Sequence, residues 1–198
     1  MFLFTQPSQD KAKALLAKQV ALPFTYAAVG ATATTPPKDF DVDRNRVQVG
    51  HGEADFLAAC AAVRRWTMFD LGWIDLLWPI APLVEGTTVG VVAHLPSVHI
   101  LNACRIVYVI NEQSDIISRF GFAYGTLPGH IERGEERFLV EWNRHDDTVC
   151  YEILAFSQPR HWLVKLGYPI ARLYQRRFVR DSLRRMHKAV LQKEFHDG

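Results

Sequence analysis

Five β-rich segments in the middle of the chain, joined by connections of only a few residues, restrict the fold more than any other feature. They are rich in Val, Ile, Phe and Tyr and span residues 87–95, 103–111, 117–127, 136–143 and 148–157. Turn-forming residues, such as those over 111–115 and the pair Pro128-Gly129, separate them. A helical crossover needs a longer connection, so successive strands are expected to pair antiparallel.

The C-terminal part of the chain has a helical period instead. Between about residues 161 and 195, apolar side chains recur every four positions at Leu166, Ile170, Tyr174 and Phe178. Pro169 lies inside this stretch, so the helix is expected to begin or kink there. The pattern predicts one long C-terminal helix with an apolar face.

The N-terminal third adds shorter elements. Helices are predicted over about 8–18 and 53–66, a strand over 46–50, and β-compatible backbone over 22–34. The aromatic residues Trp66, Phe69, Trp73 and Trp78 are expected in the core beneath the sheet rather than on a binding platform. The order of these elements predicts an α+β fold, with an antiparallel sheet closed by the C-terminal helix.

Length and composition fit a single domain spanning 1–198, because one core can serve 198 residues. The net charge of +2 and a pI of about 8.5 do not call for a nucleic-acid partner. The apolar start of the chain is too short for a secretory signal, and no apolar run approaches the ~20 residues of a spanning helix. Cys60, Cys104 and Cys150 are expected to be free thiols of a cytoplasmic protein.

A glycine turn imitates a dinucleotide-binding loop. Gly50 and Gly52 lie between a predicted strand and a predicted helix, as in the phosphate-binding turn of nucleotide-binding domains. The third glycine of that pattern is Asp55, whose carboxylate would face the phosphates. We therefore expect a structural turn here and no cofactor.

Two further patterns imitate metal sites. Asp39, Asp41 and Asp43 alternate as in a calcium loop, but the glycine and the closing carboxylate of such a loop are missing. His94 and His99 are five residues apart, on either side of a proline, and no cysteine or carboxylate completes a zinc set. We expect a solvated acidic strand and no metal.

A Gly/Pro turn between two of the β-rich segments carries the densest group of chemically useful side chains: Tyr124, His130, Glu132, Glu135, Glu136 and Arg137. Such groups can hold the polar end of a ligand, or His130 can exchange a proton near neutral pH with a glutamate. The alternative is a polar hairpin whose charges are solvated or paired. A nucleophilic hydrolase is disfavoured, because no GxSxG motif is present.

The C-terminal helix carries a cationic stripe at steps of four residues, made of Arg172, Arg176, Arg180, Arg184 and Lys188. The stripe can meet anionic lipid headgroups or other phosphates. The alternative is a solvated face whose arginine stems cover the edge of the core, with Asp181 paired to Arg185.

The motif GFAYGTLPGH, followed by GEERF, resembles the signature of an uncharacterised bacterial and plant family, one of the domains of unknown function. The stretches FTYAAVGAT, VGHGEADFLAACAAVRRW and AFSQPRHW extend the resemblance over about residues 24–186. Ile131 stands where the family motif usually has proline. The family is grouped with the START and birch-allergen-like (SRPBCC) superfamily.

This resemblance implies a helix-grip fold, in which a curved antiparallel sheet wraps around a long C-terminal helix and a cavity lies between them. It implies binding of an apolar or amphipathic small molecule there, without an established reaction. The residues expected to line the cavity are Arg105, Tyr124, His130, Glu136, Arg137, Trp142, Leu166, Ile170 and Tyr174. Two other functions stay open: a cavity enzyme using His130 with Glu132 or Glu136, and an interaction module docking its basic helix on an anionic membrane or a protein.

Overall fold

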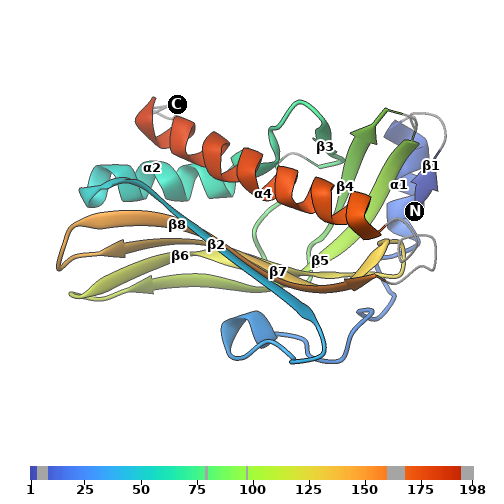
Figure 1. The fold of residues 1–198 in the computed structure, drawn as a ribbon, viewed down its shortest axis with the longest axis horizontal. Coiled ribbons are helices and arrows are strands. Elements are labelled where there is room, and N and C mark those ends of the chain that lie inside the picture. Colours follow the sequence, from blue (N-terminus) through green and yellow to red (C-terminus); the bar gives the residue numbers. More distant parts are fainter. Residues whose placement is uncertain (4–8, 79, 97, 160–167, 193–198) are drawn as a thin grey trace.

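The computed structural model describes residues 1–3, 9–78, 80–96, 98–159 and 168–192, and within them the chain forms a curled antiparallel sheet (Figure 1). Its strands run in the order β2-β8-β7-β6-β5-β4-β3, and β1 pairs with β5. Their bounds are β1 (Phe2–Leu3), β2 (Asp41–His51), β3 (Ile74–Leu76), β4 (Thr88–Leu95), β5 (Val98–Gln113), β6 (Ile117–Thr126), β7 (Glu132–Asn143) and β8 (Thr148–Pro159). Every neighbouring pair is antiparallel, as the short connections predict.

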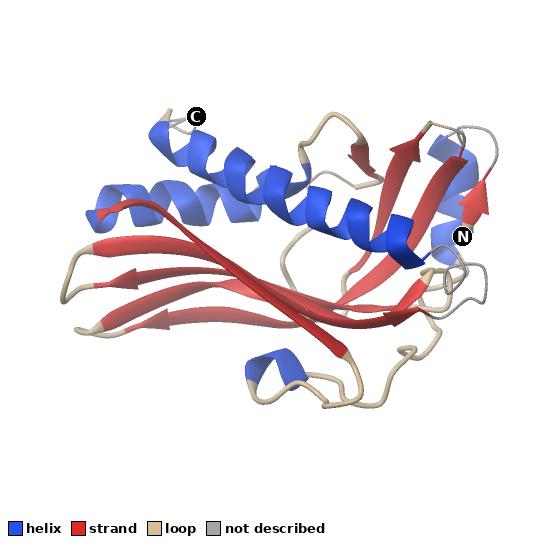
Figure 2. Cartoon of the chain, in the orientation of Figure 1, coloured by secondary structure: helices blue, strands red, loops and turns tan. Residues whose placement is uncertain are grey.

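Helices cover one face of this sheet (Figure 2). α2 (Gly52–Arg64), the short helix η2 (Thr67–Phe69) and α4 (Tyr168–Leu191) lie on that face, and α1 (Gln9–Ala17) lies beside β4. Pro169 occupies the first turn of α4, where its missing N–H removes no helical hydrogen bond. The long C-terminal helix beginning at this proline is therefore confirmed.

The core lies between the sheet and these helices. Strand alternation sends Phe138, Val140 and Trp142 of β7 towards the helices, where all three are buried. Trp66 of the segment after α2 is also buried there, with its ring 4.6 Å from that of Phe122. Of the aromatic group over 66–78, Trp66, Phe69 and Trp73 are buried, whereas Trp78 is 46% exposed.

Part of the opposite face of the sheet is covered by the loop that includes η1 (Ala31–Ala33), drawn below the sheet in Figure 1. The predicted β-compatible backbone over 22–34 is not a strand. Two of its backbone N–H groups, those of Gly30 and Thr32, donate to the carboxylate of Glu135 and not to a neighbouring strand. The loop therefore depends on one buried acid of β7.

Glycines allow the sheet to curl tightly at two points of the GFAYG and GEERF motifs. A Cβ at Gly121 would lie 2.1 Å from the backbone oxygen of Phe138 on the neighbouring strand. A Cβ at Gly134 would lie 1.9 Å from the backbone oxygen of Phe156, and Gly134 also has a φ of +150°. Only glycine fits such close approaches, which explains its presence inside two strands.

Candidate functional site

A cavity of about 390 Å³ lies between the helix-covered face of the sheet and the N-terminal half of α4. A volume of this size is typical of small-molecule sites, which start at about 300 Å³. Most of its wall is apolar, with contributions from Phe69, Trp73, Val91, Ile100, Ile170, Tyr174 and Phe178. The polar residues in the wall are Asp43, Asn102, Tyr124, Thr126, His130, Glu132, Glu135, Glu136, Ser157 and Gln175. Of these, Glu135 binds the backbone of Gly30 and Thr32 with its carboxylate.

Hydrogen bonds order the polar part of the wall. Tyr124 and Glu136 are paired across β6 and β7, and the Tyr124 hydroxyl donates to Glu136 Oε2 at 2.7 Å. Gln175 on α4 donates from Nε2 to Glu132 Oε1 at 2.6 Å. Arg172 forms a bidentate pair with Asp43 of β2, at 2.5 and 2.9 Å. Strands and helix thus meet through polar contacts on one side of the cavity.

The carboxyl group of Glu136 titrates near neutrality. Its pKa is raised to about 7, mainly by burial and also by the charges of Glu132 and Asp43, against the opposing effect of the hydrogen bond from Tyr124. Burial also raises the pKa of Glu132, against hydrogen bonds from Gln175 and Ser157. The polar part of the cavity can therefore hold or release a proton around pH 7.

This shift makes a prediction about stability. Because the pKa of Glu136 is about 7 in the fold against an ordinary value of 4.5, the folded chain binds the proton more tightly. The stabilisation is present below pH 4.5 and is lost as the pH rises to 7, by up to about 3 kcal/mol at ~1.4 kcal/mol per pKa unit. Glu136→Gln should therefore gain stability relative to the unmodified chain between pH 4.5 and 8.

Urea denaturation of both chains at several pH values measures this difference. Contributions of all other titrating groups are shared by the two chains and cancel in the comparison. Glu85→Gln, at an exposed turn residue, serves as the control and should track the unmodified chain. A difference between the chains that does not change with pH would show that Glu136 ionises normally.

His130 lies in the turn between β6 and β7 and lines the cavity. Its Nδ1 accepts a hydrogen bond of 2.9 Å from the backbone N–H of Glu132. The neutral ring therefore carries its proton on Nε2, which makes it a donor at that atom. The structure thus brings His130, Tyr124 and Glu136 into one cavity, as an acid–base site requires.

Of the nine residues expected in the cavity wall, five lie there: Tyr124, His130, Glu136, Ile170 and Tyr174. Leu166 falls outside the described residues. The remaining three, Arg105, Arg137 and Trp142, are not in the wall, and their expected placement is wrong. Each of these three side chains instead contacts another part of the chain, as described below.

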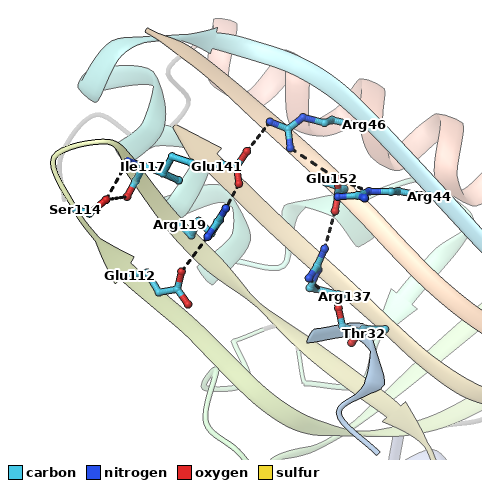
Figure 3. Close-up of polar contacts among 10 residues, drawn as sticks. All are labelled: Thr32, Arg44, Arg46, Glu112, Ser114, Ile117, Arg119, Arg137, Glu141 and Glu152. Atoms are coloured by element: carbon cyan, nitrogen blue, oxygen red, sulfur yellow. Dashed lines mark hydrogen bonds and ion pairs between the residues drawn. The ribbon is translucent and has the colours of Figure 1, made fainter. Parts of the chain in front are cut away.

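Arg137 follows Glu136 on β7, so strand alternation points it to the opposite face of the sheet. There its guanidinium pairs with Glu152 at 2.7 Å and donates to the carbonyl of Thr32 at 2.8 Å. Figure 3 shows this pair within a ladder of alternating charges, in which Glu152 also meets Arg44 at 2.9 Å. The ladder ties the strands together and leaves Arg137 unavailable to the cavity.

Arg105 and Trp142 have structural partners as well. Arg105 Nη2 donates to the carbonyls of Gln19, Val20 and Leu22, which holds the chain after α1 against the sheet. Trp142 packs beneath α2, and its indole donates to Asp147 at 2.9 Å.

The cationic stripe of α4 is only partly solvated. Arg172 is half-buried against Asp43, so it belongs to the cavity side and not to an outer stripe. The expected pair of Asp181 with Arg185 is absent, because Arg185 meets Asp70 while Asp181 pairs with Arg177 and Arg180. The other cations of the stripe, Arg176, Arg184 and Lys188, are exposed.

Several wall residues escaped sequence analysis. Asp43 was expected to be solvated, yet its partner Arg172 is 129 residues away in the chain. Phe69 and Trp73 were assigned to the core alone. Gln175 follows Tyr174 on the helix. Because it is polar, the repeat of apolar residues that predicted the cavity side of the helix did not include it.

Comparison with known proteins identifies the family. Residues 25–185 match a family described as a domain of unknown function (DUF1990). The chain belongs to this family. Among its relatives, a UPF0548 protein of Dictyostelium discoideum is 38% identical over 207 residues, which cover 96% of each chain. A UPF0548 protein of Deinococcus radiodurans is 31% identical and covers 96% of this chain and 99% of its own.

Solved structures similar to this UPF0548 chain include norcoclaurine synthase from Thalictrum flavum, at 13% identity and a TM-score of 0.46, covering 89% of this chain and 98% of that one. Human STARD10 has 10% identity and a TM-score of 0.44, covering 95% and 81%. The family resemblance and the α+β helix-grip fold expected from the sequence are both confirmed.

Two kinds of feature, a membrane-spanning helix and a cluster of metal ligands, are absent from the described residues. None of the described helices is both long and apolar enough to cross a membrane. Within the same part of the chain, no group of three His, Cys, Asp or Glu side chains is arranged to hold a metal ion.

Proposed function

We propose that this UPF0548 protein binds an apolar or amphipathic small molecule in the cavity between the sheet and α4, without changing it chemically. The observation that carries the proposal is a cavity of about 390 Å³ whose wall is mostly apolar, with a smaller set of polar residues. Such a composition suits a ligand with a long apolar part and a single polar group.

The expected affinity follows from burial. Each methylene group moved from water into the cavity gains about 0.8 kcal/mol, so a ten-carbon chain gains about 8 kcal/mol. Lost translational and rotational freedom offsets part of this gain. A dissociation constant in the range of micromolar to tens of micromolar is therefore expected for a simple ten-carbon ligand.

Filling the cavity tests the proposal. Ala171 on α4 lines the cavity, so Ala171→Trp should place an indole where the ligand lies. We expect the fluorescent probe N-phenyl-1-naphthylamine to bind the unmodified chain saturably and to bind the variant at least tenfold more weakly. Ala54→Trp, at an exposed position of α2, should bind the probe normally. Equal binding by both variants would locate the probe elsewhere and refute the proposal.

A second candidate, an acid–base enzyme in the same cavity, is favoured by one observation. Glu136, with a pKa of about 7, lies beside Tyr124 in the cavity that His130 also lines. Native mass spectrometry of the unmodified chain and Glu136→Gln, purified from the same cells, separates the candidates. A compound retained equally by both chains supports binding alone, whereas one retained only by the variant indicates a trapped substrate.

A further inference from the structure

Some hydrogen-bonding groups of the cavity have a partner within the described part of the protein, and others do not. Glu136 Oε2 accepts from Tyr124, but Oε1 is accessible and has no hydrogen-bond partner among the described residues. The neighbouring donors are engaged, since the Tyr124 hydroxyl bonds to Glu136 and the Gln175 amide bonds to Glu132. A ligand that offers a donor can therefore satisfy Glu136 without breaking an existing bond.

A second acceptor lines the same cavity from another strand. Asn102 of β5 belongs to the wall, and its side-chain oxygen is buried with no hydrogen-bond partner in the part of the chain that the structure describes. A buried acceptor without a partner costs about 1–3 kcal/mol, which a donor supplied by a ligand would recover. This observation is independent of the carboxylates and points to the same ligand chemistry.

Charge favours a donor that is also a cation. The carboxylates of Asp43, Glu132 and Glu136 line the cavity, and Arg172 is bound to Asp43. Phenols and a thiol, from Tyr124, Tyr151 and Cys104, also interact with Glu136. Burial raises the pKa of each of them, so they stay neutral and do not cancel the negative charge.

We infer that the cavity selects an amphipathic amine, whose protonated nitrogen lies against Glu136 Oε1 and whose apolar part lies along the wall formed by Trp73, Val91 and Ile100. This inference rests on the proposed function and names the ligand class for it. A carboxylate of equal length would meet the same groups with repulsion, and an alcohol would gain the hydrogen bond without the charge.

A series of three ligands with one tail tests the inference. n-Decylamine, n-decanol and n-decanoate are titrated calorimetrically at pH 8, below their aggregation concentrations. We expect decylamine to bind at least tenfold more tightly than decanol, and decanoate at least tenfold more weakly. In Glu136→Gln the preference for the amine over the alcohol should fall below about threefold, while decanol still binds. Glu85→Gln, which removes an exposed carboxylate, should keep the full preference.

Proton release gives a second readout. At pH 7 a carboxyl group with a pKa of about 7 is half protonated, so decylamine should displace about half a proton and decanol none. Calorimetry in two buffers of different ionisation enthalpy measures this number. Glu136→Gln should abolish this difference between the two ligands. A difference that persists in the variant would come from His130, which also lines the cavity, and not from Glu136.

The outcomes separate the two proposals. If decanol binds and decylamine binds no better, the amine inference fails while the proposed function stands. If none of the three ligands binds, the proposed function fails and takes the inference with it. If Ala171→Trp binds decylamine as well as the unmodified chain does, the amine is held at the acidic surface and the inference is overturned.

Discussion

Gly134→Ala is expected to lower the free energy of unfolding by more than about 4 kcal/mol, or to prevent folding. The added Cβ would lie 1.9 Å from the backbone oxygen of Phe156, and backbone cannot yield as a flexible side chain can. The N–H of Gly134 also donates to Thr126 Oγ1 at 2.9 Å, which fixes its position. Its φ of +150° adds strain for any residue with a side chain.

Gly86→Ala is the matched control. Gly86 also has a positive φ, +85°, but an added Cβ would meet no atom within 4 Å. Its substitution should cost only the backbone strain, about 1 kcal/mol. Chemical denaturation of both variants separates the cost of backbone strain from the cost of the steric clash. If Gly134→Ala does not fold, its soluble yield is compared instead. Equal stability of the two variants would show that the sheet relaxes around the added methyl group.

Glu135→Ala is expected to cost about 3–5 kcal/mol, the second largest effect. The carboxylate of Glu135 is 2% exposed and accepts hydrogen bonds from the Tyr26 hydroxyl, from two backbone N–H groups of the η1 loop and from the Thr32 hydroxyl. Removing it leaves these donors without a partner, and each unsatisfied buried donor costs about 1–3 kcal/mol. The η1 loop, which covers part of this face of the sheet, should loosen.

The adjacent residue supplies the control. Glu136 points to the other face, so Glu136→Ala should leave the η1 loop intact. Hydrogen exchange at Gly30 and Thr32 reports the difference, because both amides bond to Glu135. We expect fast exchange in Glu135→Ala and protected amides in Glu136→Ala. Protection in both variants would mean that the loop is held by other contacts.

The fold could be predicted because its signals are local. Each of the five β-rich segments contains residues of one strand, and the short turns between them decide their pairing. The period of α4 and its proline decide where the last helix begins. The η1 loop could not be predicted, because Glu135, which holds it, is more than 100 residues away in the chain.

Only part of the site could be predicted, because it also depends on contacts between segments that are far apart in the chain. Glu136 and Arg137 were both expected in the cavity wall, yet neighbours on a strand point to opposite faces, so one of the two had to be wrong. The register of Tyr124 with Glu136 decides which, and register depends on pairing that sequence alone does not give. The contact between Asp43 and Arg172 joins a strand and a helix far apart in the chain, and no local pattern marks it.

The most direct test of ligand binding in the cavity is a nuclear Overhauser measurement between n-decanol and the methyl groups of the protein. We expect contacts from the decanol chain to Val91, Ala155, Ala171 and Val179, which line the cavity from β4, β8 and α4. Contacts confined to exposed residues such as Leu57 and Val84, with none to the cavity methyl groups at saturation, would contradict this expectation.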